Sequence, residues 1–198
     1  MQIEKADAAL DRIIDADARV ERLADGFEFT EGPLWDRREG CLLFSDIPNG
    51  RIHRWSPSGG LSVFREPSFK SNGLTFDRQG RLIACEHVGR RVSRTEADGT
   101  VVALATNHAG KRLSSPNDVV VKSDGSIYFT DPPFGLINAR VGALAPRELD
   151  VAGVWRISPD GSELTLVSDE LQAPNGLAFT PDESRLYIDD SRQGTIHV

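Results

Sequence analysis

The chain has 198 residues, of which 39% are hydrophobic and 27% are charged, a composition typical of a folded globular domain rather than a disordered chain. Its formal net charge of −7 opposes binding to nucleic-acid phosphates, so a nucleic-acid partner is excluded and cations are favoured. No apolar run approaches the length of a membrane span, which excludes an integral membrane protein and predicts no membrane partner.

The predicted elements begin with a helical segment over residues 1–18. Its apolar residues recur at helical intervals, at Ile3, Ala6, Leu10, Ile13 and Ile14. The first residues carry acidic charge and lack the apolar centre of a signal peptide. Cys41 and Cys85 each lie in or beside an apolar run and are predicted as buried free thiols, which together with the missing leader favours a cytoplasmic location.

Residues 19–198 are predicted to form one partial β-propeller, because the same pattern of short strands and turns occurs four times. Glu31, Asn72 and Asn117 open the first three units at intervals of 41 and 45 residues, which is the length of one four-stranded blade. The last unit stops after its third strand. The predicted blades cover about 28–65, 70–105, 114–168 and 173–198.

The repeat therefore indicates an all-β fold of the propeller type. A β-sandwich or barrel is the alternative, but such folds do not repeat one motif at matching strand positions. The third unit is longer because residues 132–152, rich in Pro, Gly and Ala, form an insertion. A propeller protects its sheet edges by closing the ring, so an incomplete ring predicts self-association through its open edges.

Polar residues at the beginnings of the innermost strands are the candidate cation ligands, because these positions converge on the propeller axis. They are Glu31, Asn72, Asn117 and Asn175. One carboxylate combined with amide oxygens favours a hard cation such as Ca²⁺. The alternative is that Glu-Gly and Asn-Gly pairs are ordinary turn residues, although their recurrence at one blade position favours a site.

Other polar residues are predicted near the same end of the propeller, where the second strand of each blade ends. Asp131 and Asp190 fit either a site or a strand-end turn, and Asn72 fits a substrate contact. His87 is a candidate general base or substrate contact, with a backbone-bonded strand-end histidine as the alternative. The sequence contains no zinc signature, nucleophile elbow or phosphate-binding glycine loop.

Several of these motifs together resemble the gluconolactonase branch of the SMP-30/gluconolactonase/luciferin-regenerating-enzyme family. They are Phe29–Trp35, Phe44–Pro48, Ser115–Val119, Phe129–Pro132 and Pro174–Phe179. The resemblance runs from about Arg19 to Val198 and implies a six-bladed propeller, of which this chain holds about four blades. It also implies one divalent cation in the central channel, bound by the Glu31 carboxylate and by the amides of Asn117 and Asn175.

The resemblance further implies an enzyme that hydrolyses a sugar-acid lactone such as gluconolactone. The cation, Ca²⁺ or else Zn²⁺, Mn²⁺ or Mg²⁺, would polarise the lactone carbonyl while a carboxylate activates water. In the family that base is usually an Asp in a motif opening the next blade, which would fall beyond Val198. Arg112 lies just before Asn117, where the family places substrate contacts, and is expected to contact lactone hydroxyls.

Two other functions remain open from the sequence. The chain could be a non-catalytic propeller fragment or binding module, because it lacks the expected base. A strictosidine-synthase-like propeller shares the architecture with different chemistry, but the oxygen donors at the strand beginnings disfavour it.

Overall fold

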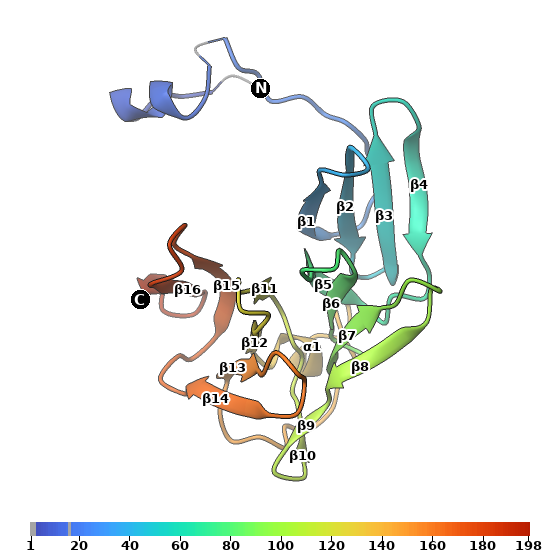
Figure 1. Cartoon of the computed structure of the whole chain (residues 1–198), viewed down its shortest axis with the longest axis vertical. Coiled ribbons are helices and arrows are strands. Elements are labelled where there is room, and N and C mark those ends of the chain that lie inside the picture. Colours follow the sequence, from blue (N-terminus) through green and yellow to red (C-terminus); the bar gives the residue numbers. More distant parts are fainter. Residues whose placement is uncertain (1–2, 16) are drawn as a thin grey trace.

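The computed structural model describes residues 3–15 and 17–198. Figure 1 shows small antiparallel sheets that follow one another around an open arc. In each sheet the strands are hydrogen-bonded in chain order, and the first strand of each lies on the inner side of the arc (Figure 1). This is the arrangement of propeller blades, as the repeat predicts.

The described chain contains four such sheets. The first contains β1 (Thr30–Asp36), β2 (Cys41–Asp46), β3 (Arg51–Ser56) and β4 (Gly60–Arg65). The second contains β5 (Ser71–Phe76), β6 (Leu82–Glu86), β7 (Arg91–Thr95) and β8 (Val101–Ala105). The third contains β11 (Val119–Val121), β12 (Ile127–Asp131), β13 (Gly153–Ile157) and β14 (Leu164–Ser168). The fourth contains β15 (Pro174–Phe179), β16 (Leu186–Asp190) and β17 (Thr195–His197).

The hairpins between the third and fourth strands of the first three sheets contain glycines with positive φ angles. Gly60, Gly99 and Gly161 have φ angles of 64°, 84° and 74°, in a region that is costly for residues with a Cβ atom. Each glycine lies where the chain reverses into the fourth strand of its sheet. The fourth strands are therefore set by local turn chemistry.

Two connections on the third sheet carry additional elements. A small hairpin of β9 (Asn107–His108) and β10 (Lys111–Arg112) precedes it, and the sequence did not predict this hairpin. The predicted insertion at 132–152 contains α1 (Phe134–Ile137). Both connections lie between strands that the repeat aligns, so they change no strand order.

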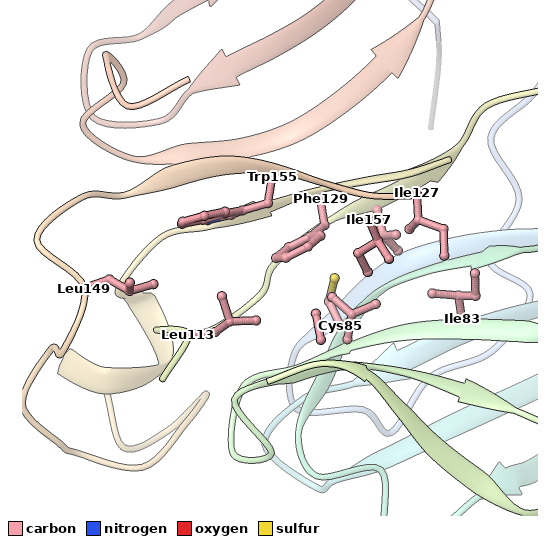
Figure 2. Close-up of a cluster of buried hydrophobic side chains, with 11 residues drawn as sticks. Ile83, Cys85, Leu113, Ile127, Phe129, Leu149, Trp155 and Ile157 are labelled. Atoms are coloured by element: carbon pink, nitrogen blue, oxygen red, sulfur yellow. The ribbon is translucent and has the colours of Figure 1, made fainter. Parts of the chain in front are cut away.

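The main apolar cluster joins the second and third sheets (Figure 2). Ile83 and Cys85 of β6 face Phe129 of β12 and Trp155 of β13, and each of these side chains is at most 1% exposed. Packing between neighbouring sheets thus removes the β6 thiol from solvent. Cys41 is also buried, and both cysteines are free thiols, as predicted.

The predicted N-terminal helix is mostly wrong. Within the described part of residues 1–18, only Ala8–Arg12 is helical, as a 3-10 helix capped by Asp7. None of its residues is buried, and Ile13 is 78% exposed. Apolar residues at helical spacing stabilise a helix by packing, and a short segment without such a contact is only marginally helical. Residues 1, 2 and 16 of the prediction lie outside the described residues.

No helix in the described part of the chain is long and apolar enough to cross a membrane. The cytoplasmic location and the self-association through open sheet edges stay predictions.

Candidate functional site

The beginnings of the inner strands meet at one cavity of about 280 Å³. Its wall contains all four residues predicted at these positions, together with His87, which follows β6. The four are Glu31, Asn72, Asn117 and Asn175. Three of them lie in the inner strands of different sheets, and Asn117 lies just before β11 of the remaining sheet. They are far apart in the sequence, so only the arrangement of the sheets around the arc brings them together.

A glycine follows three of these residues, and a side chain at any of the three positions would clash with a neighbouring segment. A Cβ atom at Gly32 would lie 2.1 Å from the backbone oxygen of Asn72. A Cβ atom at Gly73 would lie 2.5 Å from a carboxylate oxygen of Asp118. A Cβ atom at Gly176 would lie 2.7 Å from a carboxylate oxygen of Asp189. Gly32 and Gly73 are therefore points of close backbone approach, whereas Gly176 packs against a carboxylate of the neighbouring strand. All three lie within strands and not in turns.

The same strands leave the regular ladder at this point. The pairing register shifts after Glu31 in β1, after Ser71 in β5 and after Pro174 in β15. Such a bulge leaves a residue without a ladder partner and redirects its side chain. The residues skipped by the ladder include Asn72 and Asn175. Glu31 keeps its partner Ser45 directly before the shift, and Asn117 precedes the first residue of β11.

Two further carboxylates interact with Glu31 that the sequence did not assign to the ligand set. The pKa of Glu31 is raised by burial and then by the negative charges of Asp118 and Asp189. Burial also raises the pKa of Asp118, whose Oδ2 accepts the Leu177 N–H at 3.2 Å. Asp118 stands where the other three units have glycine, and that departure from the repeat was the signal that could have found it.

A second set of carboxylates, at the ends of the second strands, holds the sheets together instead of lining the cavity. Asp190 accepts N–H groups from Gln172 at 2.7 Å and from Arg192 at 2.9 Å. Asp46 accepts the Phe29 N–H at 3.3 Å. The bonds to Phe29 and Gln172 fasten the segments that lead into the inner strands of the first and fourth sheets.

Asp131 belongs to this second set and is not among the residues that line the cavity. It is fully buried, and its Oδ2 accepts the Ser114 N–H at 2.7 Å. Burial raises the pKa of Asp131 to about 7. The strand-end alternative for Asp131 therefore describes its position better than the substrate contact predicted for it.

Glu86 occupies the equivalent position in the second sheet but has ionic partners. Its carboxylate binds Arg65 at 2.9 Å and Arg91 at 2.6 Å, and it accepts a hydrogen bond from Ser93 at 2.6 Å. The carboxylate is completely buried. A buried charge of this kind needs such partners, because desolvation without them is costly.

Arg112 also lies apart from the cavity wall. It is exposed at the end of the β9–β10 hairpin, where its backbone N–H donates to Glu148 at 2.8 Å. The expected contact with lactone hydroxyls has no support in this position. The resemblance assigned Arg112 to the substrate because it lies just before Asn117 in the sequence. The β9–β10 hairpin, which contains Arg112, instead places it outside the cavity wall.

His87 contributes to the cavity wall from a buried position. Its Nδ1 lies 2.9 Å from the backbone oxygen of Val141 in the 132–152 insertion. Burial lowers the pKa of His87 to about 4, so the ring is neutral near pH 7. Both interpretations of His87 from the sequence therefore describe part of its position. One nitrogen is bonded to the backbone, and the residue also lines the cavity.

The cavity offers oxygen donors to a cation. Within the residues that the structure describes, no three His, Cys, Asp or Glu side chains form a metal-binding group. The cavity wall contains a mixed set of oxygen donors instead, which includes the carboxylate of Glu31 and the amides of Asn117 and Asn175. Oxygen ligands of this kind fit hard cations, and the repulsion that raises the pKa of Glu31 is what a bound cation would relieve.

The fold and this cavity place the chain among β-propellers with a polar site at the meeting point of their inner strands. Residues 29–198 match the family described as SMP-30/Gluconolactonase/LRE-like region. The chain belongs to this family.

Two relatives carry lactonase names. A gluconolactonase of Zymomonas mobilis is 34% identical over 211 residues, a match that covers 100% of this chain and 58% of the relative. The solved structure of a gluconolactonase from Xanthomonas campestris is 43% identical with a TM-score of 0.89, covering 93% of this chain and 62% of that protein.

A calcium-binding regucalcin from Agrobacterium tumefaciens has a TM-score of 0.65 at 17% identity, covering 86% of this chain and 53% of that protein. At this identity the similarity concerns the fold alone. The chain thus spans about 58% to 62% of the length of the two gluconolactonases.

Proposed function

We propose that this chain forms the larger part of a divalent-cation-dependent lactonase that opens sugar-acid lactones such as gluconolactone. The observation that carries the proposal is the meeting of Glu31, Asn117 and Asn175 at one cavity in a member of a family that includes gluconolactonases. We assign the Glu31 carboxylate and the two asparagine amides as cation ligands. Asn72 and His87 share the cavity wall and are assigned to the ligand's hydroxyl groups.

A cation bound there, Ca²⁺ in our proposal, would act as a Lewis acid on the lactone carbonyl and stabilise the developing oxyanion. The residues of this chain hold and orient the groups around that carbonyl. Glu31 supplies the negative charge, and Asp118 and Asp189 add to the potential that attracts a cation, as their effect on the pKa of Glu31 indicates. The amides of Asn117 and Asn175 add neutral oxygen donors.

The carboxylate that activates water is not assigned to a residue of this chain. Asp131 and Asp190, which could have replaced it, are engaged with backbone N–H groups at the ends of their strands. A base in a blade beyond Val198 is therefore part of the proposal. The second candidate function, a cation-binding propeller module without turnover, is favoured by the same observation.

The first experiment measures hydrolysis of glucono-1,5-lactone by the 198-residue chain with and without Ca²⁺, corrected for spontaneous ring opening. Calorimetry with Ca²⁺ on the same sample reports the cation site independently of turnover. The variant Glu31→Gln removes the ligand charge at nearly constant shape, and Glu170→Gln, at an exposed position outside the cavity wall, is the matched control.

We expect Ca²⁺ binding that Glu31→Gln weakens at least about tenfold, because a charged ligand is lost, and that Glu170→Gln leaves unchanged. Binding without turnover supports the cation site and a base outside this chain. Turnover that requires Ca²⁺ would place the base within the chain. Equal calcium affinity of Glu31→Gln and the unaltered chain would overturn the site.

A further inference from the structure

His87 carries a buried hydrogen-bonding atom that the fold itself does not use. The side chain is 2% exposed, and its Nε2 has no hydrogen-bond partner among the described residues. Buried polar atoms in native proteins are nearly always paired, because an unpaired one costs free energy. The ring is part of the cavity wall, so a partner for this nitrogen can come from a ligand.

The other ring nitrogen determines what kind of partner Nε2 requires. Nδ1 lies 2.9 Å from the carbonyl oxygen of Val141, and a carbonyl oxygen only accepts hydrogen bonds. Nδ1 must therefore carry the proton, which leaves Nε2 of the neutral ring with a lone pair. The unpaired nitrogen of this wall residue is an acceptor, and it requires a donor such as a hydroxyl group.

Residues 134–142, here called the cap segment, hold this arrangement in place. Four of them line the cavity, namely Phe134, Ile137, Asn138 and Val141. The ammonium group of Lys70 donates to the carbonyl oxygens of Ala139 at 2.7 Å and of Arg140 at 2.9 Å. Arg140 in turn binds the Glu28 carboxylate at 3.0 Å, which fastens the cap segment to the chain just before β1.

The cap segment also packs tightly behind the histidine. A Cβ atom at Gly135 would lie 2.8 Å from both His87 Cβ and Ser115 Cβ. The Gly135 N–H donates to Ser115 Oγ at 2.9 Å. The imidazole is therefore enclosed on the side of the cap segment, and both its tautomer and its position depend on this contact.

We propose that His87 Nε2 accepts a hydrogen bond from a hydroxyl group of the bound ligand, and that this contact makes the cavity select polyhydroxylated acids and lactones over apolar ones. This inference rests on the proposed function and adds a specificity-determining residue to its site. A hydroxyl satisfies the buried lone pair, whereas an alkyl group at the same place leaves it unpaired. Near pH 7 the low pKa of His87 keeps the acceptor available.

The test compares D-gluconate with hexanoate, a carboxylate of equal chain length without hydroxyl groups, as ligands of the calcium-supplemented 198-residue chain. His87→Asn retains a side-chain N–H that can donate to Val141 but removes the acceptor at the position of Nε2. His87→Gln restores a polar group at that position. His108→Asn, in the β9–β10 hairpin outside the cavity wall, is the matched control. Imidazole ¹⁵N shifts report the tautomer and any ligand contact directly.

We expect the unaltered chain to carry the His87 proton on Nδ1 and to shift the Nε2 resonance with gluconate but not with hexanoate. His87→Asn should bind gluconate about tenfold more weakly, with calcium and hexanoate binding unchanged, and His87→Gln should recover part of that loss. His108→Asn should change neither ligand.

Gluconate affinity that is equal in His87→Asn and the unaltered chain would overturn the inference and leave the proposed function intact. A proton on Nε2 instead of Nδ1 would also overturn it. If the unaltered chain binds calcium but neither acid, the inference and the proposed substrate class both fail. If calcium does not bind either, the cation site fails with them.

Discussion

Two sets of polar residues lie at the same end of the sheets, but one lines the cavity and the other is bonded within the fold. The set at the beginnings of the inner strands, which includes Glu31 and Asn117, lines the cavity. The set at the ends of the second strands, which includes Asp190 and Glu86, accepts hydrogen bonds and forms ion pairs within the fold. Residue type and position in the repeat are similar, so the hydrogen-bond partners decide which set is free to bind a ligand.

The largest loss of stability is expected from a substitution of Glu86. Glu86→Ala would leave Arg65 and Arg91 without their buried partner, which lowers the free energy of unfolding by about 4 kcal/mol. Asn72→Ala, in the same sheet but in the cavity wall, should cost about 1 kcal/mol. Urea denaturation of both variants measures the difference, and equal losses would contradict the division into two sets.

We expect Asp131 to make the free energy of unfolding of the chain depend on pH. Its folded-state pKa of about 7 exceeds the ordinary value of 3.8, so the native chain binds more protons between these values. The stability from this group is complete below the ordinary pKa and is lost as pH rises through about 7. Asp131→Asn retains an acceptor for the Ser114 N–H and cannot ionise.

As pH rises from about 5.5 to about 8.5, the free energy of unfolding of the variant should therefore increase by about 2 kcal/mol relative to that of the unaltered chain. Thermal or urea unfolding at both pH values measures this. The exposed Asp182, whose pKa hydrogen bonds lower, is a control position, because Asp182→Asn should show no such gain over that range. Parallel pH profiles of Asp131→Asn and the unaltered chain would show that Asp131 is ionised in the fold.

Lys70 is predicted to act locally on the cap segment. Lys70→Met removes the ammonium that holds carbonyl oxygens of residues 139 and 140, while the methylene chain is largely retained. Hydrogen exchange should show the amides of the cap segment opening about 1 kcal/mol more easily. The pKa of His87 should rise, because the Lys70 charge contributes to lowering it. Unchanged exchange in the cap segment would mean that its other contacts suffice.

The smallest effect is expected at Glu31 without calcium. Its raised pKa reflects burial and repulsion by Asp118 and Asp189, so the charged form destabilises the fold above that pKa. Glu31→Gln should raise the free energy of unfolding by only a few tenths of a kcal/mol, since the group is partly exposed and screened. Calcium should stabilise the unaltered chain but not this variant, and a loss of stability in the variant without calcium would assign Glu31 to the structural set.

Much of the strand order was predictable because it depends on local chemistry. Turn glycines such as Gly99 and Gly161 require positive φ angles, and the alternation of strand and turn follows the repeat. The N-terminal helix was not predictable from spacing, because Ile13 has no core to pack against and is exposed. The site residues at the inner strands were predicted from their repeated position, whereas Arg112 was misplaced by a hairpin that breaks the repeat.

The sequence by itself determined that this chain is built from repeated four-stranded units with polar residues at their inner beginnings, because both properties are local and periodic. Only the tertiary structure decided which of those residues meet. Several of its features depend on segments that lie far apart in the chain. They are the repulsion of Glu31 by the charges of Asp118 and Asp189, the burial of Asp131 and the bond between His87 and Val141. Burial and the partners it imposes are properties of the packed sheets, and they set the pKa of each group and leave only some of them free to bind.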